Sequence, residues 1–569
     1  MSLITISSNH QLSIIEEHFK VLAGPGAGKT YFLVNHIRNL LRNSKRLSVS
    51  KKIACITYTN VATEKILRSV GDHGGRLEIS TIHSFLYKYI IKPYSFAVAS
   101  TYNLAYEKVQ GHDDIVMSGY SFFEEWKKST KQNYVDHNDA IKAWNSLKWQ
   151  IKPDKSLELV TPYPVKSGKY FIKKESYLEY KKMMWSEGYL HHDDVLFFSY
   201  QVLKNNPFVL EILRACFPYF LVDEFQDTSP IQIEILALLA AKETMVGVIG
   251  DEIQSIYSFL GAVPGQLHSF NLPGIKEYVI KDNWRGSNEI VALLNLIRTD
   301  ITQQAKRNIS VAPPTILVGE KIKCLEWVEG KYTSKVIVSL SRDNLTANSM
   351  LKRVSIAGSD LLVELGATDS NSERRKLMSN SIKAIEYAKM GYYKDAIKTI
   401  NKSFGFAKTK QNQKHALKTL CKLLEKEEVF STGKLMDLYN FINTEGLASP
   451  SKFKTGPIKT FYENADYNAL TLAVRNLYEA GSHRTIHKSK GEEFECVLLI
   501  LDKDEKGQFN ETKELSFLLT PNLVDDEEHR ILYVAISRAR DHLFISVPQL
   551  SSINQGKLDS MGFRFEYVS

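Results

Sequence analysis

The sequence has few cysteines, and the five that it contains stand far apart. None of them forms a C-x-x-C pair, which argues against the common zinc spacings and against a disulfide framework. The chain also lacks an apolar run of about 18 residues, the length that a membrane helix needs. Its first residues, MSLITISSNHQ, lack the basic and then apolar plan of a signal peptide. We therefore expect a cytoplasmic protein with no membrane partner.

Internal repeats and low-complexity tracts are lacking as well, and neither sign of charge dominates. The 569 residues are 43% hydrophobic and 24% charged, with a formal net charge of +9. Such a composition is typical of a globular protein, and the length allows several domains. The mild basic excess favours a polyanionic partner without identifying it.

Several short apolar runs end abruptly in polar residues: KIACITYTN, YFLVDEFQD, MVGVIGDEIQ and CVLLILD. This pattern is typical of buried parallel strands whose carboxyl ends bind ligands. Two long stretches of different character lie between them. One, at 93–190, is rich in aromatic residues and lysine, and the other, at 358–480, has Lys, Glu, Leu and Ala at helical spacing. We expect both to be helical insertions into an α/β framework.

The stretch VLAGPGAGKTYF reads as the end of a strand, a glycine-rich turn and the start of a helix. Such a turn can point successive backbone N–H groups at phosphate oxygens, and the following helix adds its dipole. Lys29 would reach the β- and γ-phosphates, and Thr30 would hold Mg²⁺. The residues of the predicted phosphate cradle are Ala23, Gly24, Gly26, Ala27 and Gly28. Ala23 departs from the strict pattern, which has glycine there. A chance glycine-rich turn is the alternative, but the apolar strand before it and the helical period after it favour the phosphate site.

The second half of such a site should be an acid at the end of a strand, and YFLVDEFQDTS provides one. Asp223 could hold the Mg²⁺ through water, and Glu224 could take the proton from an attacking water molecule. Adjacent carboxylates are more often a solvated turn. Here they follow an aromatic and aliphatic strand, which favours the catalytic interpretation.

Eight motifs together resemble the ordered series of the superfamily 1 helicases related to UvrD, Rep and PcrA. They are AGPGAGKT, ITYTN, STIHSF, VDEFQDTS, VIGDEIQSIYSFLGA, DNWRGS, TIHKSKGEEFECV and EEHRILYVAISRARD, and they run from about residue 9 to residue 545. The resemblance implies an α/β fold with two RecA-like P-loop motor domains. Each domain would have a parallel sheet and a mainly helical insertion.

The resemblance also implies six segments. The first motor domain would comprise 1–92 and 191–280, with its insertion at 93–190. The second would comprise 281–357 and 481–569, with a reduced insertion at 358–480. ATP would bind between the two motor domains.

The family's nucleotide contacts fall on six further residues of this chain. Gln11 would read the adenine, Trp284 would stack on it in place of the usual Tyr, and Gln254 would sense the γ-phosphate. Arg285 and Arg538 would stabilise the charge that develops on the transferred phosphoryl group, and Glu493 would lie at the nucleotide. Lys29, Glu224, Gln254 and the two arginines would thus be the catalytic residues, with ATP and Mg²⁺ as cofactors.

In the family, the residues that face DNA are aromatic rings that stack on bases, and small polar or histidine side chains near the strand. They are Thr57, Tyr58, Thr59, Asn60, His83, Tyr257, Phe259 and His487. An aromatic residue at a strand end is more often part of a core, and a lone histidine is more often structural. Their place in the motif series favours the DNA contact.

The run LHHDDVLFF at 190–198 places two histidines and two aspartates in a row. Consecutive residues on a helix point in different directions, so four such ligands converge poorly on one metal ion. The run is similar to the family's DFDDLL, where the chain returns from the first insertion. We expect no metal there.

Some positions depart from the family pattern. The family's GWRGA reads SFLGA here, so that Phe259 replaces Trp and Leu260 replaces Arg, which puts the coupling of hydrolysis to strand separation in doubt. The second insertion is short, and the last motif lies close to the end of the given sequence, so we expect neither the family's long C-terminal tail nor an appended nuclease.

The resulting hypothesis is an ATP-dependent DNA helicase or translocase that moves 3′ to 5′ on single-stranded DNA or at a junction with duplex. One alternative is a DNA-stimulated ATPase or sensor that works with a partner nuclease, or with a repair protein. Compact helicases of this family occur beside nucleases in anti-phage systems such as Gabija. The other alternative is a nucleotide-gated DNA-binding protein without motor activity.

Overall fold

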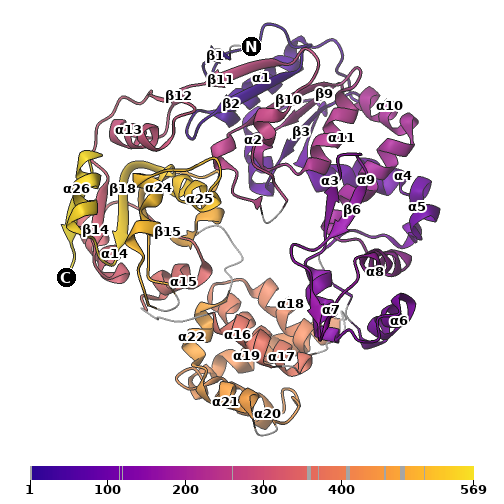
Figure 1. Cartoon of the computed structure of the whole chain (residues 1–569), viewed down its shortest axis with the longest axis vertical. Coiled ribbons are helices and arrows are strands. Elements are labelled where there is room, and N and C mark those ends of the chain that lie inside the picture. The colour runs from indigo at the N-terminus through magenta and orange to yellow at the C-terminus, as the bar shows by residue number, and fades with distance from the viewer. Residues whose placement is uncertain are drawn as a thin grey trace. The chain divides into compact units, whose positions relative to one another are not determined.

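The fold is described from a computed structural model of the whole chain (Figure 1). The structure describes residues 3–113, 116–117, 119–258, 261–354, 360–369, 371–404, 410–453, 456–474, 481–504 and 507–569, with the side chains of all of these except 372 and 410–412. Within those ranges, no helix combines the length and the apolar character that a membrane crossing requires.

Two compact units make up the chain. The first comprises Met1–Trp284, Thr299–Lys306 and Leu523–Arg530, and the second comprises Arg285–Arg298, Arg307–Asn522 and Ile531–Ser569. The six segment boundaries expected from the sequence stay a prediction.

The first unit is built on a seven-stranded parallel sheet in the order β1-β11-β2-β10-β9-β3-β4. Its strands are β1 (Ile4–Ile6), β2 (Phe19–Ala23), β3 (Ile53–Thr57), β4 (Leu77–Thr81), β9 (Tyr219–Val222), β10 (Met245–Gly250) and β11 (Lys276–Ile280). The central strands β2, β3 and β9 are buried along almost their whole length, as expected for a parallel sheet covered by helices on both faces.

Helices follow these strands and begin at recognisable sequence signals. They are α1 (Lys29–Asn43), α2 (Asn60–Val70), α3 (Ile82–Leu86), α9 (His192–Asn205), α10 (Pro207–Cys216), α11 (Pro230–Ala240) and the short α12 (Gln266–Ser269). For example, α11 begins with a capping box between Ser229 and Gln232, with Pro230 in the first turn. Short 3₁₀ turns, Phe225–Asp227 and Glu252–Gln254, follow β9 and β10. A small parallel pair, β12 (Asp282–Asn283) and β13 (Gln304–Ala305), completes the unit.

The insertion of the first unit is mainly helical, but it also contains two short antiparallel hairpins. Its helices are the π-helical turn Tyr87–Ile91, α4 (Lys92–Tyr94), α5 (Phe96–Tyr102), the 3₁₀ turn Tyr106–Lys108, α6 (Tyr120–Thr130), α7 (His137–Asn145) and α8 (Glu175–Ser186). The hairpins pair β5 (Lys148–Ile151) with β6 (Leu157–Val160), and β7 (Lys166–Ser167) with β8 (Tyr170–Phe171).

The second unit has a six-stranded parallel sheet in the order β16-β15-β17-β18-β14-β19. Its strands are β14 (Thr315–Val318), β15 (Ile337–Ser341), β16 (His483–Thr485), β17 (Phe494–Ile500), β18 (Ala539–Val547) and β19 (Arg564–Tyr567). Helices α13 (Asn288–Ile297), α14 (Lys321–Lys331), α15 (Asn344–Lys352), α23 (Glu511–Glu514), α24 (Ser516–Leu519) and α26 (Ser552–Ser560) accompany it, with the 3₁₀ turn Ile486–Ser489. Helix α25 (Glu527–Ile536) contributes its first turn to the first unit and the rest to the second.

The insertion of the second unit is a separate helical group with its own hydrophobic core, drawn in salmon and orange in Figure 1. It comprises α16 (Leu361–Thr368), α17 (Ser372–Lys389), α18 (Tyr393–Ser403), α19 (Lys410–Glu425), the 3₁₀ turn Glu427–Val429, α20 (Leu435–Thr444), α21 (Pro457–Asn464) and α22 (Tyr467–Leu472). The predicted fold class, α/β with two parallel sheets and a mainly helical insertion in each half, is confirmed.

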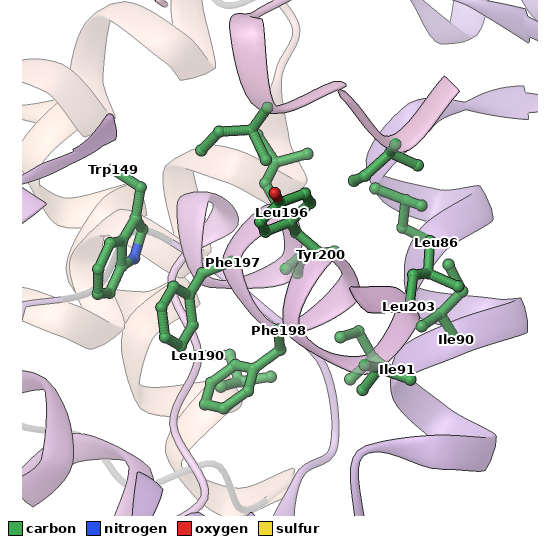
Figure 2. Packing of buried hydrophobic residues seen from close by; sticks show 14 of the residues in the cluster. Leu86, Ile90, Ile91, Trp149, Leu190, Leu196, Phe197, Phe198, Tyr200 and Leu203 are labelled. Carbon is green, nitrogen blue, oxygen red and sulfur yellow. The ribbon is translucent and has the colours of Figure 1, made fainter. Parts of the chain in front are cut away.

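Helix α9 is the element that packs the first insertion onto the first sheet. Figure 2 shows its residues Phe197, Phe198 and Leu203 between Trp149 of β5 on one side and the π-helical turn on the other. The rings of Trp149 and Phe197 stack with centroids 3.9 Å apart. Nearly all residues of the apolar run VLFFSYQVL are buried. The helix therefore packs against both β5 and the π-helical turn.

A buried carboxylate reinforces this junction. Asp194 of α9 accepts hydrogen bonds from the indole nitrogens of Trp149 (3.0 Å) and Trp185 (3.1 Å). It also lies 2.9 Å from the ammonium of Lys181 on α8, and both charged side chains are almost fully buried. Burial alone would raise the pKa of Asp194, but Lys181, His191 and the Trp149 indole more than offset it, so the pKa is lowered.

We expect Asp194→Asn to lower the free energy of unfolding by about 3–5 kcal/mol, because it leaves the buried ammonium of Lys181 without its counter-ion. Denaturant titration followed by tryptophan fluorescence measures this, since two indoles contact the site. The control is Glu64→Gln, which breaks an exposed ion pair with Arg68 and should cost no more than about 1 kcal/mol. Equal, small effects of the two substitutions would show that the buried pair contributes little.

Candidate functional site

The glycine-rich turn joins β2 to α1 in the first unit. Gly26 and Gly28 have φ values of 69° and 82°, in the left-handed region, and Gly28 is the residue that precedes the first turn of α1. A Cβ added at Gly28 would lie 2.8 Å from the Cβ of Ser8. Glycine is therefore required there for both conformation and space.

Two side-chain amides and one backbone N–H from a distant part of the chain hold this turn in place. The amide groups of Asn283 and Gln303 donate to the Pro25 carbonyl at 3.0 and 2.9 Å, and the Trp284 N–H donates to the Gly26 carbonyl at 2.8 Å. A Cβ on Gly24 would meet the Gln303 amide at 2.5 Å. The turn is thus pre-shaped by contacts that do not involve a ligand.

The residues present fit a nucleotide phosphate and a magnesium ion. The Lys29 ammonium folds over the turn and donates to the carbonyls of Ala23 (3.3 Å) and Gly24 (3.4 Å), which are long bonds that a phosphate could replace. Thr30 follows in the first turn of α1. Mg²⁺ is usually held by one or two protein ligands together with substrate phosphates, and one hydroxyl with one carboxylate suits that role. Among the described residues, no group of three or more His, Cys, Asp or Glu side chains is arranged to hold a metal ion.

The acidic pair stands at the same edge of the sheet, directly after β9. Asp223 is buried, and its pKa is raised to about 7 by burial and by the charge of Glu224, against the opposing effect of Lys29. Glu224 has a φ of 52°, a left-handed conformation that costs a non-glycine residue roughly 1–3 kcal/mol. The Glu224 N–H also donates to Asp223 Oδ1 at 3.0 Å.

A buried amide connects this pair to the next strand. Gln226, which is completely buried, donates through Nε2 to Glu224 Oε2 at 2.6 Å and accepts from the Asp251 N–H through Oε1 at 2.9 Å. Asp251 in turn accepts from the side chain of Gln254 at 2.5 Å. A Cβ on Gly250 would lie 2.5 Å from Gln226 Oε1, so the glycine at the end of β10 makes room for the amide. Gln226 therefore links Glu224 to the segment that carries Gln254.

The predicted nucleotide residues of the second unit gather around Ser537. Arg285 forms an ion pair with Glu493 (Nε–Oε2 3.1 Å) and donates to the Ser537 carbonyl at 3.0 Å. Arg538, which is buried, donates to the Ser537 hydroxyl at 2.8 Å. The structure thus brings these three predicted residues together within their unit. In the first unit Gln11 and Trp284 are exposed.

A pocket of about 1150 Å³ in the first unit contains several of the predicted DNA contacts. Tyr58, Asn60 and His83 line it together with Asp223 and Glu224. Its volume exceeds the roughly 300–1,000 Å³ of a typical small-molecule site, which favours an extended ligand. Asp223 and Glu224 therefore lie both at the edge of the sheet that carries the phosphate turn and in the wall of this pocket.

The remaining predicted DNA residues have more varied surroundings. Thr57 lines the pocket, but its hydroxyl bonds to Thr63 at 2.7 Å, and Thr59 caps α2 by accepting from the Ala62 N–H at 3.1 Å. The ring of Tyr257 stacks on Tyr58 with centroids 4.7 Å apart and an interplanar angle of 16°.

Two predictions for DNA contacts fall elsewhere in the chain. Phe259, like the neighbouring Leu260, lies outside the described residues. His487 lies in a 3₁₀ turn of the second unit, after β16.

Three residues of this site were not singled out from the sequence. Gln226 stands inside the quoted motif VDEFQD, and its position between two catalytic candidates was a signal that could have identified it. Asn283 stands beside the quoted Trp284, whereas Gln303 lies in no motif. Their contacts with the phosphate turn depend on pairing between β12 and β13, which no local pattern predicts.

The fold and site define a class: a P-loop protein with a glycine-rich turn suited to a nucleotide phosphate, a strand-end acid pair and an adjoining large pocket. Residues 6–273 match the UvrD/REP helicase N-terminal domain, and residues 331–549 match the UvrD-like helicase C-terminal domain. The chain belongs to the UvrD/Rep-like family of DNA helicases.

Individual relatives are distant. A DNA helicase II homologue of Mycoplasma genitalium is 25% identical over 95% of this chain and 84% of its own length. The ATP-dependent DNA helicase Rep of Salmonella typhimurium is 28% identical over 51% of this chain, and Gabija protein GajB of Bacillus cereus is 26% identical over 50%. The matches span only 42% and 47% of the lengths of Rep and GajB.

We expect Gln226→Met to lower kcat for ATP hydrolysis by about 10- to 100-fold, because the Glu224 carboxylate loses the amide that positions it. The KM for ATP should stay near that of the unmodified chain, since the phosphate turn is untouched. The matched control is Gln132→Met, in which an equally buried, hydrogen-bonded glutamine of the insertion is replaced. A loss of kcat of the same size in both variants would assign the effect to general destabilisation.

Proposed function

We propose that the chain is an ATP-driven motor that moves 3′ to 5′ along single-stranded DNA and couples hydrolysis to strand separation. The observation that supports it best is the shared wall: Glu224, the candidate general base, lines the same pocket as Tyr58, Asn60 and His83. A strand that fills this pocket would contact the segment that carries the base. Hydrolysis would then depend on DNA.

The chemistry would proceed on the nucleotide bound at the turn between β2 and α1. Lys29 would bind the β- and γ-phosphates, and Glu224 would accept the proton of the attacking water, with Gln226 fixing one of its oxygens. Mg²⁺, held by Thr30 and Asp223, would offset negative charge on the phosphates. The roles of Gln11, Gln254, Trp284, Arg285, Glu493 and Arg538 at the nucleotide are part of the same proposal.

The DNA would lie on backbone-contacting and stacking groups rather than on groups that read the bases. Asn60 and His83 provide polar side chains on the pocket wall, and the stacked pair Tyr58–Tyr257 provides an aromatic platform. Stacking of this kind tolerates any sequence. We therefore expect little base preference.

Lys29→Ala should abolish DNA-stimulated ATP hydrolysis, because the phosphates lose their cation. Glu224→Gln should keep ATP binding but reduce hydrolysis by about 100-fold or more, because it removes the proton acceptor. Steady-state phosphate release and nucleotide binding are the measurements, and Lys45→Ala, which changes an exposed lysine near the end of α1, is the control. Normal turnover in either active-site variant would refute the assignment of that residue.

Unwinding of a partial duplex with a 3′ overhang, and not of one with a 5′ overhang, is the expected behaviour in the presence of ATP and Mg²⁺. A gel or fluorescence strand-displacement assay with both substrates measures it. The second candidate is a DNA-stimulated ATPase that needs a partner nuclease, and the match to GajB favours it. Stimulated hydrolysis without unwinding of either substrate would select this candidate. Binding without stimulated hydrolysis would instead indicate a nucleotide-gated DNA-binding protein.

A further inference from the structure

The two adjacent histidines that precede α9 point to different places. His191 is buried and accepts a hydrogen bond from the Lys181 ammonium through Nδ1 at 2.9 Å. It therefore belongs to the buried cluster around Asp194. His192, one residue on, lines the large pocket instead.

In the pocket wall His192 meets two other histidines from distant parts of the chain. Its Nδ1 lies 2.5 Å from Nδ1 of His112, and its ring centroid lies 5.8 Å from that of His83. The rings of His83 and His112 are 6.2 Å apart. All three residues line the pocket, so three imidazoles from α3, α9 and the loop before α6 form one group, here termed the histidine trio.

The geometry of the trio does not suit a metal ion. Two imidazole nitrogens on one tetrahedral zinc, with Zn–N distances of about 2.0–2.1 Å, lie roughly 3.3 Å apart. The two Nδ1 atoms lie within hydrogen-bonding distance of each other, which is the arrangement of a hydrogen-bonded pair and not of two ligands around one ion. One ring must donate and the other accept, because two N–H groups or two lone pairs facing each other at this distance would repel.

The charged and titratable groups around the trio are mixed in sign. Lys148 of β5 lines the same pocket and lies 3.8 Å from Asp193, which follows His192. Burial raises the pKa of Asp193, against the lowering effects of Lys148 and Lys181. On the π-helical turn, Tyr87 lies with its ring 5.4 Å from that of His112, and burial raises the pKa of this tyrosine, so it is uncharged. Asp113 follows His112 along the chain.

We propose that the His112–His192 pair binds a phosphodiester group of single-stranded DNA and takes up a proton when it does so. The inference rests on the proposed function, because the DNA must enter this pocket. It assigns two residues outside the motif series to the DNA site.

Proton uptake is expected because the hydrogen-bonded pair holds a single proton between its two Nδ1 atoms. An anionic phosphate oxygen that reaches the pair needs a donor from each ring, whereas the hydrogen-bonded pair provides one N–H between the two nitrogens. Binding of one more proton would break the His112–His192 bond and give both rings an N–H that points at the phosphate. The solvent supplies this proton.

The sign of the pH dependence follows from this linkage. The bound state holds more protons than the free state, so affinity for DNA should rise as the pH falls. One linked proton changes Kd by up to about tenfold per pH unit between the pKa values of the free and the bound pair. A purely structural histidine pair would give no such slope.

The test is isothermal titration calorimetry of the full chain with a single-stranded oligothymidylate at one pH near 7. It is carried out in two non-phosphate buffers with different enthalpies of ionisation. The difference in observed enthalpy gives the number of protons taken up per DNA bound. We expect a value between zero and one for the unmodified chain and none for His192→Phe. Phenylalanine should pack there, because the family's DFDDLL has it at this place.

Three further results separate the possible failures. His268→Asn, which changes an exposed histidine away from the pocket, should keep the proton uptake of the unmodified chain. Equal uptake in the unmodified chain and in His192→Phe would overturn the inference, as would DNA binding with no uptake at all. In both cases the proposed motor function would stand. Failure of the unmodified chain to bind the oligonucleotide would overturn both.

Discussion

The parallel pairing of β2, β10, β9 and β3 is the constraint on which the rest of the first unit depends. Gly250 pairs with Leu22, Val248 with Val222, and Ile56 with Val222, so these four strands end along one edge of the sheet. Parallel strands put all their carboxyl ends on the same side, and ligands bind there. A phosphate turn, an acid pair and an aromatic platform, which are separated by up to about 230 residues in the sequence, therefore come to the same edge of the sheet.

Proximity at this edge creates an electrostatic problem, which buried amides solve. Asp223, Glu224 and Asp251 bring three carboxylates to two adjacent strand ends, and burial without partners would be costly. Gln226 and Gln254 each donate to one of these carboxylates. Neutral amides can fix such groups without cancelling the negative charge that a metal–nucleotide complex needs. The residue at the end of β10 is a glycine, and a Cβ there would collide with the Gln226 amide.

Features formed by contiguous residues could be predicted from the sequence, whereas features that join distant segments could not. The phosphate turn from Gly24 to Thr30 is contiguous, and the strand ends follow apolar runs, so fold class and these candidates could be predicted. The support from Gln303 could not, because its hydrogen bond to the Pro25 carbonyl joins residues that are 278 positions apart in the sequence. The hairpins of the first insertion were missed because their strands are two to four residues long. Helix geometry predicts that the side chains of His191 and His192 point to different places. It does not predict that His112, from a distant loop, lies beside His192.

The wall of the pocket beside Asp223 and Glu224 combines a rigid part with a part that, in our proposal, changes its protonation. Trp149 lines the pocket while its indole is held by Asp194, whose charge is balanced by Lys181 in a buried site. His192 stands two residues from that carboxylate but faces the pocket. Because α9 fixes both side chains on one helix, the buried ion pair sets the position of the imidazole. A buried ion pair that adds little stability over an apolar replacement, although loss of one partner is costly, can thus serve specificity of position. Here the position it sets is that of a group next to the proposed path of the DNA.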